Sequence, residues 1–157
     1  MMQDWKPQPP RVPQVLLVED HASDAFLLQA AFEEAGVTVT LHVVRDGEEA
    51  LAFVRRAAPF TAAPTPDLML LDLNLPRVGG LSVLEVIKAD AETRSIPVVV
   101  LSTSNARVDI EGAYAREAEA YQVKPRTFSE LIAFVQRLQH GQDDVPGLSS
   151  PEPWLGD

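Results

Sequence analysis

The sequence contains no cysteine. Disulfides and thiolate metal sites are therefore excluded, and we expect a reducing compartment such as the cytoplasm. Aromatic residues make up only 6% of the chain, and no apolar stretch approaches the roughly 20 residues that cross a bilayer, so we expect no membrane partner. Positive charge is also scarce, since 23 acidic residues against 13 lysines and arginines leave a net charge of −10. Such a surface repels phosphates, which argues against nucleic acid as a partner.

The two ends of the chain are rich in proline and differ from the middle. Residues 1–13 are expected to form a flexible arm, and residues 140–157 a loosely ordered tail. Between them, residues 14–139 contain enough apolar residues for one domain with a full hydrophobic core. The tail carries Trp154 and Leu155, and one interpretation is that these apolar residues dock on the partner in a homodimer.

Short apolar runs alternate with segments of helical periodicity throughout the middle of the chain. The expected strands are 14–18, 39–43, 67–71, 98–101 and 120–123. The expected helices begin near Ser23, Asp46, Gly80, Asn105 and Thr127. Five strands alternating with five helices predict an α/β fold, in which a parallel sheet is covered on both faces. The polar alternation of 39–43 suits an edge strand, and a doubly wound sheet of order 2-1-3-4-5 accommodates this.

Acidic residues follow two of the predicted strands. Glu19 and Asp20 come directly after 14–18, and Asp72 comes directly after 67–71. Parallel neighbouring strands would bring these carboxylates to the same edge of the sheet, where their negative charges repel one another. A hard divalent cation with oxygen ligands would hold them together, so the sequence predicts a Mg²⁺ site.

Polar residues also follow the fourth and fifth strands. Ser102 follows 98–101, and Lys124 with Pro125 follows 120–123. Each alone is an ordinary turn residue. Together with the acidic residues they mean that four of the five strands deliver a charged or reactive side chain to one rim of the sheet, which indicates a functional site.

These motifs resemble the receiver domains of response regulators in two-component signalling. The matching motifs are Glu19-Asp20, Asp72-x-Asn74-x-Pro76-x-x-Gly79, Ser102 five residues after Pro97, and Tyr121-x-x-Lys124-Pro125. The resemblance covers residues 14–139 and implies a CheY-like variant of the flavodoxin fold.

The resemblance implies that Asp72 accepts a phosphoryl group and that the chain catalyses only its own phosphorylation and dephosphorylation, so it is not a conventional enzyme. Asp20 and Asp72 would bind Mg²⁺ directly, Glu19 through water, and the backbone carbonyl of Asn74 would complete the ligands. Positioning and charge neutralisation would supply most of the catalysis, because a carboxylate is a weak nucleophile.

The remaining motif residues would bind the phosphoryl group and transmit its presence. The resemblance implies that Lys124 pairs with Asp72 and reaches the phosphoryl oxygens, across a cis Lys124–Pro125 bond. Ser102 would donate its hydroxyl to a phosphoryl oxygen, and Tyr121 would rotate inward behind it as a switch.

The implied phosphoryl donor is a sensor histidine kinase. The segments 91–96 and 101–104 resemble those of stand-alone receivers that are paired with phytochrome-type kinases. Residues 140–157 are too few for a DNA-binding module, so we expect the signal to leave by contact with a partner protein or a second copy.

Two other functions share parts of this pattern. A Mg²⁺-dependent phosphatase with an aspartate nucleophile needs a second acid two residues later, where this chain has Asn74. A receiver-like module that only binds its partner would not need Asp72 and Lys124. His21, beside the acidic pair, is interpreted as a bystander rather than a ligand.

Overall fold

A computed structural model describes residues 11–142 of the chain. The strands are β1 (Gln14–Val18), β2 (Thr40–Val44), β3 (Leu68–Leu71), β4 (Val98–Ser102) and β5 (Ala120–Val123). The helices are α1 (Ala22–Ala35), α2 (Gly47–Arg55), α3 (Gly80–Ala89), α4 (Arg107–Ala115) and α5 (Phe128–Gln142). All strand pairs are parallel, in the order β2-β1-β3-β4-β5, which confirms the predicted topology.

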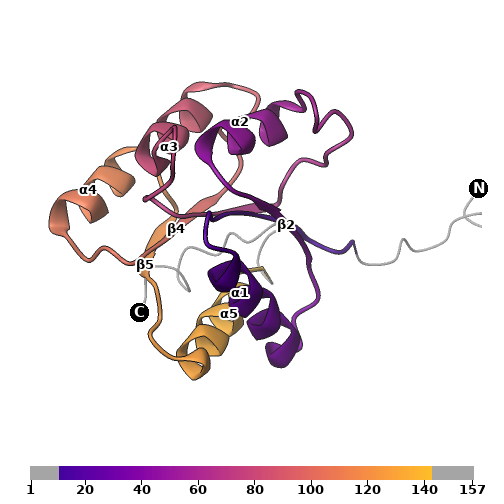
Figure 1. Ribbon diagram of the computed structural model, residues 1–157, viewed down its shortest axis with the longest axis vertical. Coiled ribbons are helices and arrows are strands. Elements are labelled where there is room, and N and C mark those ends of the chain that lie inside the picture. The colour runs from indigo at the N-terminus through magenta and orange to yellow at the C-terminus, as the bar shows by residue number, and fades with distance from the viewer. Residues whose placement is uncertain (1–10, 143–157) are drawn as a thin grey trace, which may run out of the picture.

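Helices cover both faces of the sheet. Helices α1 and α5 lie side by side on one face, while α2, α3 and α4 cover the other (Figure 1). Neighbouring residues of the central strands point to opposite faces, so that Leu17 packs into the cluster under α1 and α5, and Leu16 into the cluster on the other side. Both are at most 2% exposed, and burial of such a side chain stabilises the fold by about 1.5–3 kcal/mol.

Strands β3 and β4 are buried along their whole length and β1 is buried from Val15 onward, while β2 is the half-exposed edge that its polar alternation predicted. Strand β2 runs one residue later than expected, because the parallel pairing with β1 continues to Val18 opposite Val44. Val44 is 2% exposed, so its burial favours this last pair of the ladder.

Most helix ends follow the predicted signals. Gly36 ends α1 in the left-handed region at φ 71°, where glycine has no Cβ penalty. Asp46 caps α2 by accepting a hydrogen bond from the Glu49 N–H, and Thr127 accepts one from the Glu130 N–H at the start of α5. The expected cap at Asn105 is wrong: α4 begins after Ala106, whose N–H donates to the Ser104 hydroxyl oxygen.

Contacts with the domain begin before residue 14 in the described chain, since the Arg11 guanidinium forms an ion pair of 2.6 Å with Asp67 at the start of β3. Helix α5 continues to Gln142, beyond the expected end at 139. The predicted arm and tail, including Trp154 and Leu155, otherwise lie outside the described residues. Within 11–142, every helix is too short or too polar to cross a bilayer.

Candidate functional site

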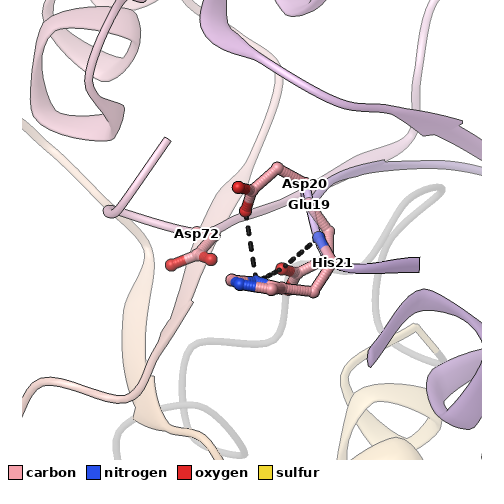
Figure 2. A group of neighbouring side chains, drawn as sticks. All are labelled: Glu19, Asp20, His21 and Asp72. Atoms are coloured by element: carbon pink, nitrogen blue, oxygen red, sulfur yellow. Dashed lines mark hydrogen bonds and ion pairs between the residues drawn. The ribbon is translucent and has the colours of Figure 1, made fainter. Parts of the chain in front are cut away.

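The carboxyl edge of the sheet gathers the predicted acidic residues. Val18 of β1 lies beside Leu71 of β3, so the residues that follow these two strands become neighbours. Carboxylate oxygens of Glu19, Asp20 and Asp72 lie within 4.8 Å of one another, together with a ring nitrogen of His21 (Figure 2). Glu19 and Asp72 are each only 3% exposed, so water screens their repulsion poorly.

Lys124 enters this cluster from the end of β5. Its ammonium lies 2.7 Å from Glu19 Oε1, 3.0 Å from Asp24 Oδ2 and 3.5 Å from Asp72 Oδ2. The sequence predicted the pair with Asp72, but Glu19 and Asp24 are the nearer partners. Asp24, in the first turn of α1, was predicted only to open that helix, because its approach to Lys124 depends on how α1 packs against α5.

The site shifts the proton affinity of both reactive groups. Burial raises the pKa of Asp72, although the Asn74 N–H and the Lys124 charge act against this shift. Burial lowers the pKa of Lys124, but hydrogen bonds to Glu19 and Asp24 and the charge of Asp72 outweigh it, so the net shift is upward. The Lys124 ammonium therefore stays charged. Its charge does not fully offset the effect of burial on Asp72, because the pKa of Asp72 remains raised.

The donor atoms fit a hard cation. Oxygen atoms of three carboxylates converge, and these are the ligands that Mg²⁺ and Mn²⁺ accept. Asp20 Oδ1 is buried and has no hydrogen-bond partner within the described part of the chain. A buried carboxylate oxygen without a partner is costly, and a metal ion would satisfy it.

The His21 ring also lies in the cluster, and its interpretation as a bystander to the chemistry stays a prediction. Its Nδ1 lies 3.1 Å from Glu19 Oε2 and 3.2 Å from Asp20 Oδ1, the latter without hydrogen-bond geometry (Figure 2). The hydrogen bond to Glu19 and the charge of Asp20 raise the pKa of His21. The signal in the sequence was its position directly after two acids, but the turn alone does not determine where the ring lies.

Ser102 and Tyr121 meet through Ser104. Ser102 is fully buried at the end of β4, and its hydroxyl oxygen accepts a hydrogen bond of 3.2 Å from the Ser104 N–H. The Tyr121 hydroxyl donates to the Ser104 carbonyl over 2.9 Å. The Ser104 hydroxyl also donates to Asp109 in the first turn of α4. The two predicted switch residues are therefore linked to α4 by one serine whose linking role the sequence did not reveal.

The loop after β3 is held close to Asp72. The Asn74 N–H donates to Asp72 Oδ1 over 3.1 Å; the predicted role of the Asn74 carbonyl toward a metal stays a prediction. A Cβ on Gly80 would lie 2.4 Å from the Asp72 carbonyl oxygen, whereas a Cβ on Gly79 would stand clear of other atoms among residues 11–142. Gly80, rather than the motif residue Gly79, is thus the glycine that this close approach requires.

The expected cis bond before Pro125 is wrong for this structure. The one cis peptide in residues 11–142 is Ala58–Pro59. An X–Pro bond is trans by default, by about 0.5–1 kcal/mol, unless its surroundings reverse the preference. Lys124 reaches the acidic cluster without the cis bond.

The family model for the response regulator receiver domain matches residues 15–136. The chain is 37% identical over 131 residues to response regulator Rcp1 of Synechocystis sp., which is 83% of this chain and 88% of Rcp1. It is 39% identical over 142 residues to the probable methanogenesis regulatory protein FilR2 of Methanothrix harundinacea, which is 90% of this chain and 83% of FilR2.

Solved structures agree in fold. The Mn²⁺-bound form of Rcp1 aligns with a TM-score of 0.75 at 36% identity, over 81% of this chain and 91% of that one. The phosphorylated cyanobacterial phytochrome response regulator RcpA aligns with a TM-score of 0.78 at 39% identity, over 83% of this chain and 93% of RcpA. With the family model spanning nearly the whole described domain, this chain belongs to the response regulator receiver domain family.

Proposed function

We propose that Asp72 accepts a phosphoryl group from the phosphohistidine of a sensor histidine kinase, and that the modified protein signals by contact with a partner. The observation that supports this is the convergence of a buried aspartate, two further carboxylates and one ammonium at the carboxyl edge of the sheet. Phosphoryl transfer needs little covalent chemistry from a protein beyond such positioning and charge.

In this transfer, an Asp72 carboxylate oxygen forms a bond to phosphorus as the nitrogen–phosphorus bond of the donor breaks. The electron pair of that bond stays with the imidazole nitrogen, which takes up a proton. Lys124 then neutralises charge on the phosphoryl oxygens, and the Ser102 hydroxyl donates to one of them. Both groups lie at the same rim as Asp72, although Ser102 at present engages Ser104.

Glu19, Asp20, Asp72 and the Asn74 carbonyl would hold Mg²⁺, which supplies positive charge beside the transferred oxygens. The Mn²⁺-bound relative Rcp1 supports a divalent cation in this family. In the described part of the chain, Asp20 Oδ1 accepts no hydrogen bond and carboxylates outnumber ammonium groups, and both observations favour the same site.

The output surface of this proposal consists of α4, β5 and α5. Ser104 joins Ser102, Tyr121 and the start of α4, so a change at Ser102 has a short path to that surface. We propose a phytochrome-type kinase as the partner, because RcpA is a phytochrome response regulator. A homodimer, a cytoplasmic location and the absence of nucleic-acid binding remain predictions from the sequence.

The decisive experiment is incubation with Mg²⁺ and acetyl phosphate, followed by mass spectrometry of proteolytic peptides. We expect one added phosphoryl group at Asp72, lost in Asp72→Asn and retained in the matched variant Asp67→Asn at the other end of β3. Continuous release of phosphate from many esters would instead support the phosphatase, and an unmodified protein would support a module that only binds.

A further inference from the structure

The Lys124 ammonium is shared between two sides of the site. Asp72, the proposed phosphoryl acceptor, is its most distant acidic partner at 3.5 Å. Asp24 of α1 lies closer, at 3.0 Å, and Glu19 is the nearest partner, at 2.7 Å. An ammonium has three hydrogens to donate, and here each carboxylate can receive one. A hydrogen donated to a phosphoryl oxygen on Asp72 would therefore be withdrawn from one of these three carboxylates.

The side of Lys124 that faces α1 has room for its stem. A cavity of about 70 Å³ is lined by Leu17, Asp24, Leu27, Lys124 and Leu131 among others, between the sheet and the pair of helices α1 and α5. Its apolar walls suit the methylene groups of lysine, while Asp24 offers a carboxylate for the charged end. Lys124 thus has a favourable position that does not depend on Asp72.

The two flanking carboxylates differ in solvent exposure. The Glu19 side chain is 3% exposed, and its hydrogen bonds to Lys124 and His21 hold it in place. The Asp24 side chain is 42% exposed, so water can replace Lys124 when the pair breaks. Asp24 is therefore the partner that Lys124 can leave most easily.

We propose that Asp24 is a positioning residue, which holds the Lys124 ammonium toward α1 in the unphosphorylated protein and competes for it with the phosphoryl group on Asp72. This inference rests on the proposed function, since the competition exists only if Asp72 is phosphorylated. Removal of the Asp24 charge then frees Lys124 for the phosphoryl oxygens. Asp24 thereby sets how readily the protein becomes phosphorylated.

A purely helical role for Asp24 makes a different prediction. An acid in the first turn of a helix interacts favourably with the helix dipole, whatever lies at position 124. The effect of such a residue on phosphorylation would be small, and it would not depend on Lys124.

The first test measures the fraction of protein phosphorylated at Asp72 over a range of acetyl phosphate concentrations, with Mg²⁺, by mass spectrometry. We expect Asp24→Asn to lower the half-saturating concentration about two- to fivefold, as befits loss of a half-exposed ion pair. Asp24→Glu restores a carboxylate and should return toward wild type. Glu34→Gln removes the same charge from the exposed far end of α1 and should match wild type. An unchanged or raised concentration for Asp24→Asn would overturn the inference.

The second test needs no phosphorylation. A double-mutant cycle compares the urea midpoint of Asp24→Asn in the wild-type background and in Lys124→Gln, without Mg²⁺. We expect Asp24→Asn to be more favourable in the Lys124→Gln background, where it relieves repulsion and breaks no ion pair. Equal effects in both backgrounds would refute the coupling. If the wild type takes up no phosphoryl group, the proposed function fails. If the wild type is phosphorylated and Asp24→Asn responds to acetyl phosphate as the wild type does, the inference alone fails.

Discussion

Two aspartates stand at opposite ends of strand β3, and their supplies of positive charge differ. Asp67, before the strand, accepts hydrogen bonds from the two terminal guanidinium nitrogens of Arg11 at 2.6 and 2.8 Å, and from the Gln14 N–H at 2.7 Å. Asp72, after the strand, has a Lys124 contact of 3.5 Å that it shares with Glu19 and Asp24. One end of the strand holds a matched ion pair, and the other holds several acids around one ammonium.

The difference separates an acid that has its own counterion from an acid that shares one. A bidentate arginine satisfies both oxygens of Asp67 and ties the entering chain to the sheet. At Asp72 the fold leaves negative charge incompletely neutralised in a buried place, which costs stability unless a cation or a reaction uses it.

Removal of the single ammonium should have the largest effect. Lys124→Gln leaves Glu19 and Asp72 buried without a positive partner, and we expect a loss of about 3 kcal/mol in the free energy of unfolding without Mg²⁺. Arg11→Gln is the matched change at the other end of β3 and should cost much less, because its guanidinium is mostly in solvent. Urea unfolding measures both, and equal losses would contradict the contrast between the two ends.

Mg²⁺ should stabilise the folded protein by binding the acidic cluster at the carboxyl end of β3, and not Asp67 at the other end. At ten times its dissociation constant, a ligand of the folded state adds about 1.4 kcal/mol by linkage. We expect this increase, seen as a higher melting temperature, in the wild type and in Asp67→Asn but not in Asp20→Asn. A melting curve that ignores millimolar Mg²⁺ would rule out the metal site.

Replacing an acid with its neutral amide should change the free energy of unfolding in opposite directions at the two ends of β3. Asp72→Asn and Asp20→Asn relieve repulsion, so we expect them to stabilise the metal-free protein by on the order of 1 kcal/mol while abolishing phosphorylation. Asp67→Asn breaks a satisfied ion pair and should destabilise it by a similar amount. Chemical denaturation in EDTA compares the three variants. Destabilisation by all of them would show that Asp72 contributes more through its contacts with Lys124 and Asn74 than it costs through repulsion.

The pH dependence should be the smallest effect. Burial raises the pKa of Asp72 above its ordinary value of 3.8, so the folded protein keeps this proton at pH values where the unfolded chain has lost it. The contribution to stability is therefore greatest below that ordinary value and is lost as pH rises through the folded pKa. Denaturation midpoints measured across this range without metal should show the downward trend in the wild type and in Asp67→Asn. In Asp72→Asn the trend should be weaker.

The secondary structure could be predicted because its signals are local. The apolar runs of β1 and β5 gave the observed bounds, and Gly36, Asp46 and Thr127 mark helix ends as expected. Asn105 does not cap α4, because Ser104 takes that place in the turn. The Ser104 hydroxyl accepts a hydrogen bond from the Ala106 N–H and donates one to Asp109. Local signals do not rank such competitors.

The sequence predicted which residues form the site, but not which carboxylates lie nearest to Lys124. Parallel strands bring their carboxyl ends to one edge, so Glu19, Asp20 and Asp72 had to meet once the strands were placed. The partners of Lys124 depend on side-chain positions that no strand pattern specifies. Asp24 reaches it because α1 packs beside α5, about 100 residues later in the chain.

The order of apolar and polar residues along the chain was sufficient to determine the sheet, its two layers of helices and the edge at which the acidic residues gather. Burial of alternating faces and the direction of parallel strands leave few other arrangements. Tertiary structure alone decided how one ammonium is divided among three carboxylates, since that division depends on ångström differences in distance and on solvent exposure at a helix packing contact.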